Sequence, residues 1–178
     1  GVYEITNLPG LVRRYQGLEL DVAWETKRVH LFANWTISGS KGNVEYTQHL
    51  GSDYDINPDH FVNRYGYLAD DRRHRVKLYG WADLPKQFTL SWDAFYGSGS
   101  SYSVVDTATP LYGSIFVEPR GSRRLTSAFN LDVELRKAWT FAEKAELQLI
   151  GSIFNLTGEN SVTGESGNVN NLGSITSY

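Results

Sequence analysis

Cysteine is absent from this chain of 178 residues, and two other features are missing as well. Without cysteine, a disulfide framework, a zinc ribbon and a cysteine nucleophile are all excluded. Basic charge is not in excess either: 17 scattered Lys and Arg residues stand against 20 Asp and Glu, which indicates no nucleic-acid partner. No stretch approaches the roughly 20 apolar residues that a transmembrane helix needs.

Aromatic residues and glycine, in contrast, are abundant. Aromatic side chains make up 13% of the chain and glycine occurs 17 times, a mixture that favours strands and turns over helices. Six segments alternate apolar and polar side chains with a period of two, which no helix produces. In the clearest one, Phe88, Leu90 and Trp92 alternate with Thr89 and Ser91. The sequence therefore predicts an all-β fold with strands near 12–24, 28–38, 73–83, 87–97, 124–138 and 144–155.

The connections between these strands alternate between short turns and long loops, the loops lying near 39–70, 98–122 and 156–178. The strands reach about ten residues or more, whereas strands of soluble proteins usually have about five or six. Bilayer-crossing strands need this length, and outer-membrane barrels combine short periplasmic turns with long extracellular loops. We therefore expect an antiparallel up-and-down transmembrane β-barrel segment of about six strands, in the outer membrane of a Gram-negative bacterium.

Tryptophan placement agrees with this expectation. Trp24, Trp81 and Trp139 each lie at the end of a strand beside one of the short turns. Aromatic girdles of outer-membrane barrels lie at the two membrane interfaces. We expect these three side chains to form part of the periplasmic girdle.

Four local motifs resemble those of a known family. They are RYQGLEL at 14–20, DRRHR at 71–75, SAFNLDV at 127–133 and IFNLT at 153–157. In this order and spacing they resemble strands of the C-terminal β-barrel of TonB-dependent outer-membrane receptors, in particular the subfamily with a carboxypeptidase-regulatory-like domain ahead of its plug. The resemblance extends over nearly the whole chain.

This resemblance implies a role and a set of partners. The chain would form part of the barrel wall and the extracellular loops of a receptor that imports a ligand, and siderophore, glycan and peptide all remain open. Its partners would be outer-membrane lipid and lipopolysaccharide, the rest of the barrel and its plug, and the TonB complex, reached through parts not in this chain. Since a plug and a closing strand with a terminal aromatic residue are not recognised here, we expect an incomplete barrel.

Two other interpretations remain open at this stage. A small self-contained outer-membrane barrel or adhesin would need an even number of strands, at least eight, and a closing terminal strand. A soluble carbohydrate-binding β-sandwich would need a buried core between two sheets and strands about half as long as these.

Catalytic chemistry finds little support, so we expect neither an enzyme nor a cofactor. The paired carboxylates Glu19 and Asp21, and likewise Asp132 and Glu134, share one face of a strand, as expected of a polar lumen. Histidines show no i, i+4 helical pair of the metalloprotease type. The four histidines are His30, His49, His60 and His74.

One loop segment carries weak candidates for metal binding. Asp53, Asp55 and Asn57 place oxygen ligands at alternate positions, as a calcium loop does. An EF-hand is rejected, because the sixth position lacks glycine and Arg64 occupies the position of the bidentate glutamate. A looser calcium site in an extracellular loop and a solvated run of turns are the two interpretations left.

Basic side chains gather at the loop-side ends of two neighbouring predicted strands. We expect them either to reach the headgroup region as interfacial cations or to bind anionic groups, such as lipopolysaccharide phosphates or an anionic substrate. The residues are Arg72, Arg73, Arg75 and Lys77 at one strand, and Arg120, Arg123 and Arg124 at the other.

Overall fold

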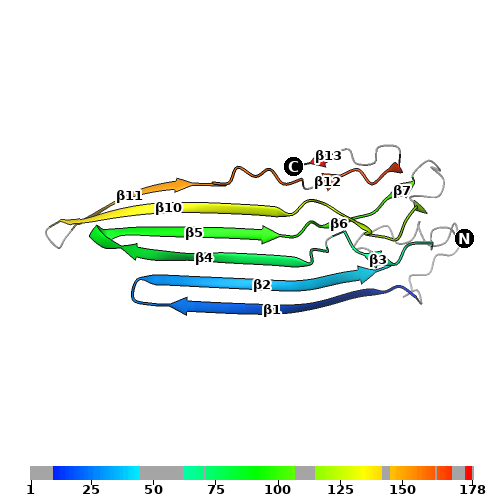
Figure 1. The fold of residues 1–178 in the computed structure, drawn as a ribbon, viewed down its shortest axis with the longest axis horizontal. Helices are drawn as coiled ribbons and strands as arrows, with labels where there is room; N and C mark the ends of the chain where they lie inside the picture. The colour runs from blue at the N-terminus through cyan, green and yellow to red at the C-terminus, as the bar shows by residue number, and fades with distance from the viewer. Residues whose placement is uncertain are drawn as a thin grey trace, which may run out of the picture.

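The computed structural model describes residues 10–44, 62–69, 71–106, 115–141, 145–162, 164–169 and 175–177. A single long antiparallel sheet dominates these residues, with its six long strands in the order β1-β2-β4-β5-β10-β11 (Figure 1). The strands are β1 (Arg13–Glu25), β2 (Val29–Gly42), β4 (His74–Leu84), β5 (Phe88–Gly97), β10 (Ala128–Phe141) and β11 (Ala145–Ile153). Each long strand pairs with the next long strand along the chain, which confirms the all-β, up-and-down prediction.

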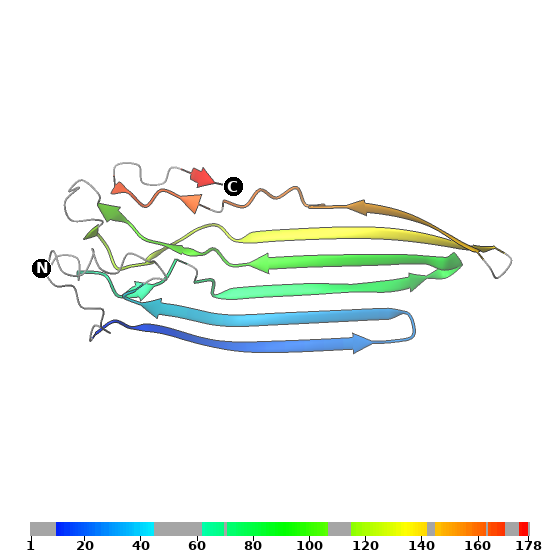
Figure 2. The ribbon, with the colours of Figure 1, turned by 180° about the vertical axis from the view of Figure 1, so that it is seen from behind.

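Short strand pairs lie at one end of this sheet, which we call the loop end (Figure 2). The opposite, turn end carries the close connection between β1 and β2 and the 3-10 turn η2 (Pro85–Gln87) between β4 and β5. The short strands are β3 (Gly66–Tyr67) beside β2, β6 (Ser101–Tyr102) with β9 (Arg123–Arg124), β7 (Val105–Asp106) with β8 (Ile115–Phe116), and β12 (Gly164–Glu165) with β13 (Ile175–Ser177). The described residues contain no helix long and apolar enough to cross a membrane.

Observed strand limits differ most from the predicted ones at the loop end. β2 continues to Gly42, past the predicted end at 38, because Gly39 to Gly42 still pair with β1 although their side chains no longer alternate. β10 begins at Ala128 and not at 124, because Arg123 and Arg124 pair with β6 as the separate strand β9. Backbone pairing, which apolar periodicity does not report, decides both limits.

The register keeps one side of the sheet mainly apolar across all six long strands, with the charged side chains of Arg14 and Lys41 toward the loop end and of Lys137 toward the turn end. Residues directly opposite each other in a pairing share a face, and Leu20 is opposite Trp35, Trp35 is opposite Val76, and Val76 is opposite Tyr96. We call this side the apolar face. Its large members are Leu18, Leu20, Val22 and Trp24 of β1; Val29, Leu31, Trp35 and Ile37 of β2; Val76, Leu78 and Leu84 of β4; Phe88, Leu90, Trp92 and Tyr96 of β5; Phe129, Leu131, Val133, Leu135, Trp139 and Phe141 of β10; and Leu147, Leu149 and Ile153 of β11.

The other side, the polar face, carries hydrogen-bonding and charged side chains. Asn34 donates from Nδ2 to carboxylate oxygens of Glu19 and Asp21, each at 2.7 Å, and Ser152 donates to Glu134 at 3.1 Å. Both predicted carboxylate pairs therefore lie on this face. Further members are Thr36, Arg75, Lys77, Ser91, Asp93, Asn130, Asp132, Arg136, Glu146 and Gln148.

No second layer covers the apolar face within the described parts of the chain. The buried hydrophobic residues there are Leu68, 0% exposed, and Val104, 3% exposed, and both lie at the loop end outside the long strands. Leu20 and Leu147, in contrast, remain exposed on the apolar face. The core between two sheets that a β-sandwich requires is therefore not found among the described residues.

The three tryptophans beside the turns do not share one face. Trp24 and Trp139 lie on the apolar face, opposite Leu31 and Leu147 respectively. Trp81 lies on the polar face, where its ring stacks on His30 with the ring centroids 4.5 Å apart. The expectation that Trp81 joins the other two in a girdle is wrong, because its odd position in β4 places it with the charged side chains.

Glycine is required at one position of the apolar face and not at another. A Cβ on Gly80 would lie 2.2 Å from the carbonyl oxygen of His30 and 2.9 Å from Trp92, whereas one on Gly151 would meet nothing within 4 Å. We expect Gly80→Ala to lower the free energy of unfolding by about 1–3 kcal/mol through overpacking. Gly151→Ala should leave it unchanged or raise it by less than about 1 kcal/mol, because alanine narrows the unfolded ensemble.

Denaturant titration of the two variants measures this difference directly. Both substitutions add one methyl group to the same face of the same sheet, so Gly151→Ala controls for the chemistry of the change. Equal stability losses in the two variants would contradict the close backbone approach at Gly80.

Candidate functional site

The three residues predicted as weak metal ligands lie in a part of the chain that the structure does not describe. Asp53, Asp55 and Asn57 lie outside the described residues, so the calcium-loop hypothesis stays a prediction. His49 and His60 lie outside them as well. Within the residues that are described, no three His, Asp or Glu side chains gather in a group that could hold a metal ion.

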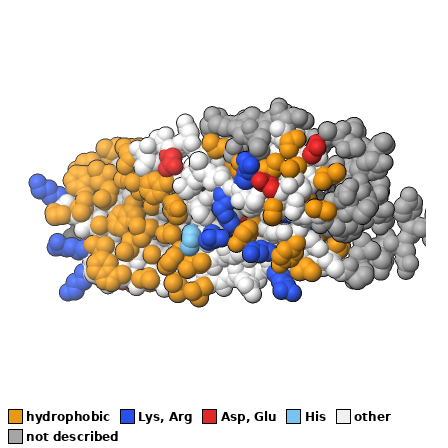
Figure 3. All heavy atoms as spheres, turned by 45° about the vertical axis from the view of Figure 1, so that its right-hand side comes forward, with side chains coloured by type: hydrophobic (Ala, Val, Ile, Leu, Met, Phe, Trp, Pro, Cys, Tyr) orange, Lys and Arg blue, Asp and Glu red, His pale blue; other side chains and the backbone are white. Residues whose placement is uncertain are grey.

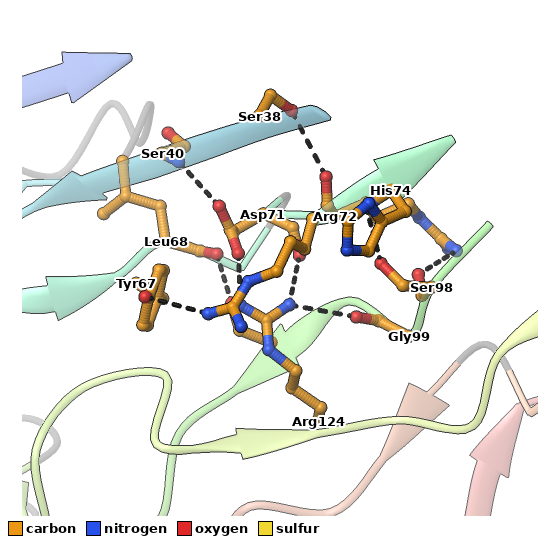
Figure 4. Close-up of polar contacts among 12 residues, drawn as sticks. Ser38, Ser40, Tyr67, Leu68, Asp71, Arg72, His74, Ser98, Gly99 and Arg124 are labelled. Atoms are coloured by element: carbon orange, nitrogen blue, oxygen red, sulfur yellow. Dashed lines mark hydrogen bonds and ion pairs between the residues drawn. The ribbon is translucent and has the colours of Figure 1, made fainter. Parts of the chain in front are cut away.

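The loop end is organised around the carboxylate of Asp71, which is 1% exposed as a side chain (Figure 4). One carboxylate oxygen accepts the backbone N–H of Ser40 at 2.6 Å. The other accepts Nη2 of Arg124 at 2.5 Å, and the Arg124 side chain is 28% exposed. This nearly buried charge is therefore balanced by a cation from β9 and fixed by a backbone donor from β2, as burial of a carboxylate requires.

Backbone groups of the same region complete a loop-end clamp, which we define as Asp71, Arg124, Leu68 and Ser101. Leu68 donates its N–H to the carbonyl of Ser40 at 3.0 Å, and Ser101 donates its N–H to the carbonyl of Asp71 at 3.2 Å. The Ser101 hydroxyl donates to the carbonyl of Leu68. Arg124 Nη1 reaches the carbonyls of Asp71 and Gly99 at 3.3 and 3.2 Å. The clamp joins segments far apart in the sequence.

The predicted basic side chains do not form two simple groups. Arg124 belongs to the clamp, Arg123 pairs with Glu118 at 2.7 Å, and Arg72 donates to the carbonyl of Ser98 at 3.3 Å. Hydrogen bonds from Arg123, and then from Ser122, hold the pKa of the Glu118 carboxyl below its usual value. Arg75 and Lys77 project from the polar face and Arg120 is buried. Only Arg73 of this set lines the basic pocket described next.

A basic pocket of about 280 Å³ opens at the loop end of β1 and β2. Two of its cations meet a phenol: Arg73 donates to the Tyr67 hydroxyl at 3.1 Å, and Lys41 Nζ lies 4.4 Å from the centre of the Tyr67 ring. The pocket is lined by Arg14, Gln16, Ser38, Gly39, Lys41, Tyr65, Tyr67 and Arg73. No carboxylate is among these residues, so the pocket presents donors and positive charge.

The nearby positive charges lower the pKa of the Tyr67 phenol. Burial raises the pKa of its phenol, but hydrogen bonds from Lys41 and Arg73, and the charges of both, lower it by more. The net pKa is below the ordinary 10.0. The surroundings of this phenol therefore favour an anionic oxygen.

The basic pocket was missed by sequence reasoning, although one signal could have found it. Continuing the apolar-face positions of β1 beyond Leu18 leads to Arg14, and those of β2 beyond Ile37 lead to Lys41. The register pairs Arg14 with Lys41 and Lys41 with Tyr67. The phase of the alternation identifies the face on which these cations lie, but only the pairing brings them together.

Apart from the basic pocket, a hollow of about 310 Å³ lies on the polar face, between β5, β10 and β11. Asp93 and Asp132 are directly opposite each other there, and Asp132 Oδ1 accepts Asn130 Nδ2 at 3.0 Å and the N–H of Asn155 at 2.8 Å. These donors offset part of the repulsion between the two carboxylates. The hollow can accept hydrogen bonds from a polar solute or water.

Comparison with known proteins adds no identification. Neither a family model, nor a curated protein, nor a solved structure matches this chain.

Neutralising the clamp carboxylate should loosen the loop end. Asp71→Asn keeps the shape of the side chain but leaves the Arg124 guanidinium without its counter-charge, and we expect a local loss of about 3 kcal/mol, the low end for a broken buried pair because Arg124 is partly exposed. Hydrogen exchange at the Ser40, Leu68 and Ser101 amides should accelerate.

Arg123→Gln supplies the matched control, because it removes an exposed ion pair from the neighbouring residue of the same strand. Its amide exchange should match the unsubstituted protein. If Asp71→Asn leaves the three amides as protected as Arg123→Gln does, the clamp does not depend on the buried charge.

Proposed function

We propose that this chain forms part of the barrel wall and the extracellular mouth of a TonB-dependent outer-membrane receptor that imports a ligand. The observation that carries the proposal is the apolar face, which continues across six long strands without a covering layer in the described residues. An uncovered apolar surface of this extent would be a liability in water, whereas lipid satisfies it.

Strand dimensions support a bilayer as the partner of this face. The six strands have between 9 and 14 residues, which corresponds to lengths of about 30–46 Å. At the tilt of about 45° usual in outer-membrane barrels, they rise about 21–33 Å. The hydrocarbon core of a bilayer is about 30 Å thick, and the apolar band of such barrels is about 25 Å tall. The lengths therefore agree with a membrane crossing.

The two ends of the sheet support an orientation. The turn between β1 and β2 spans only 26–28, and η2 has three residues, whereas the loop end carries the clamp and four short strand pairings. Outer-membrane barrels keep their short turns in the periplasm and extend their long loops outward. We accordingly assign the turn end to the periplasm and the loop end to the extracellular side.

The polar face supports a lumen that accommodates water, a ligand or other parts of the receptor. Its side chains are hydrogen-bonded across strands, as Asn34 is to Glu19 and Asp21, and Ser152 to Glu134. Near the turn end, the rings of Phe32 and Tyr79 stack with centroids 5.3 Å apart. The inner-membrane TonB complex would supply energy through parts of the receptor not in this chain, and the imported ligand remains open among siderophore, glycan and peptide.

Tryptophan fluorescence tests which face meets lipid. Trp35 on the apolar face and Trp81 on the polar face are nearly equally exposed, at 41% and 38%, so a pair of variants that keep only one or the other forms a matched comparison. In vesicles with brominated acyl chains we expect strong quenching of Trp35 and little of Trp81, and the reverse with aqueous iodide. Equal quenching of the two by brominated lipid would reject the membrane assignment.

Energised uptake tests the receptor assignment itself. Cells that produce the whole receptor of which this chain would form part should accumulate one of a panel of labelled siderophores, glycans or peptides, and a protonophore or loss of the inner-membrane TonB complex should abolish the uptake. Passive diffusion through a self-contained barrel would continue under both treatments. Uptake that persists without the energy source would therefore favour the self-contained barrel over the receptor.

A further inference from the structure

We propose that the basic pocket binds a phosphate group of an outer-leaflet lipid headgroup, as carried by lipopolysaccharide. This inference depends on the proposed membrane function, because it requires the apolar face to meet lipid. Its ligand chemistry is a phosphate monoester, and its main residues are Arg14, Lys41 and Arg73, with Tyr67 between them.

Uncompensated positive charge is the first argument. Among the described residues, ion pairs join Arg123 to Glu118 and Arg124 to Asp71, and none involves Arg14, Lys41 or Arg73. The buried carboxylate nearest in sequence, Asp71, is already bonded to Arg124 and to the N–H of Ser40. Three cations that converge on one pocket without a carboxylate repel each other, and an anion would relieve the repulsion.

Tyr67 supplies the second argument, because its phenol marks where the donors converge. Arg73 donates to the Tyr67 hydroxyl, and Lys41 and Arg124 lie over the Tyr67 ring, with Arg124 Cζ 5.0 Å from its centre. The clamp holds Arg124 in this position. A phosphate oxygen beside the hydroxyl would accept the same donors, and an arginine and a lysine together offer planar and point-charge contacts to phosphate.

Depth is the third argument. On β1 and β2 the last large apolar pair toward the loop end is Leu18 with Ile37, and Arg14 with Lys41 lies four residues further along. Four residues correspond to about 13 Å along a strand, or about 9 Å of height at a tilt of about 45°. The headgroup region extends about 5–8 Å beyond the hydrocarbon, and long basic side chains bend back toward it.

The surface view agrees with this position. Hydrophobic side chains cover the turn-side part of the molecule, and Lys and Arg side chains gather where that cover ends (Figure 3). Tyr65, which also lines the pocket, is exposed there. Exposed tyrosine beside cations is the composition expected at a lipid headgroup boundary. A site for a free anion in solution would not need to lie next to the end of an apolar face.

Lipid binding by the purified protein in detergent micelles tests the proposal. Native mass spectrometry with bisphosphorylated lipid A, dephosphorylated lipid A and inorganic phosphate separates the headgroup from the free anion. We expect the unsubstituted protein to prefer the bisphosphorylated lipid by about tenfold or more, which corresponds to one lost charge-assisted contact or more. The triple variant Arg14→Gln/Lys41→Gln/Arg73→Gln should lose that preference.

Two further variants control for charge and for folding. Lys27→Gln/Arg28→Gln/Lys86→Gln removes three exposed cations from the turn end and should keep the preference. Arg14→Lys/Lys41→Arg/Arg73→Lys keeps the charge and should keep most of it. Equal binding of the dephosphorylated lipid, tight binding of inorganic phosphate alone, or an unchanged preference in the triple glutamine variant would each overturn the proposal.

Trp35 quenching by brominated lipid, measured in vesicles on the same variants in a background that keeps only Trp35, distinguishes failure of the phosphate site from failure of the membrane assignment. If Trp35 is quenched in every variant while phosphate selectivity does not depend on the pocket, the membrane assignment stands and the phosphate site is wrong. If Trp35 is quenched in none, the proposed function has failed, and the phosphate site fails with it.

Discussion

The structure depends on one constraint: the alternation of side chains must stay in phase through five successive antiparallel pairings. From β1 to β11, the pairings place most apolar side chains opposite apolar ones, as Leu20 with Trp35 and Leu135 with Leu90 show, and Lys137, which is opposite Phe88 and Leu149, is an exception near the turn end. A slip of one residue in any pairing would turn a whole strand over and expose its charged side chains on the apolar face. The alternation therefore keeps the apolar and the polar side chains on separate faces of the sheet.

The loop end is stabilised in a different way, because it has very little apolar core. Leu68 and Val104 are the buried hydrophobic residues among the described parts, and the segments meet instead around the Asp71 carboxylate and its backbone partners. A buried ion pair contributes modestly to stability but tolerates few alternative arrangements, since removing one partner leaves an unbalanced charge. The clamp thus fixes the arrangement of the segments at the loop end, while the long strands form the two large faces of the sheet.

Periodicity predicted the six long strands and the two faces, because a period of two is local information, and the alternation of short turns with long loops predicted the up-and-down order. It did not predict the continuation of β2 to Gly42 or the separation of Arg124 into β9, since both follow from backbone pairing between distant segments. The Asp71 motif was recognised as the start of a strand, but its burial depends on tertiary contacts. The basic pocket needed Tyr67 to be paired beside Lys41, which neither residue signals by itself.

The outer strands β1 and β11 each pair along one side only within the described residues, so the sheet has two open edges. Any strand that extends it must continue the same two-sided chemistry. The register of an added strand can therefore shift only in steps of two residues, about 7 Å. A shift of one residue would place its apolar side chains on the polar face. A mispaired strand at such an edge would therefore adopt one of a few discrete registers. Each of these registers would still keep its apolar and polar side chains on opposite faces of the sheet.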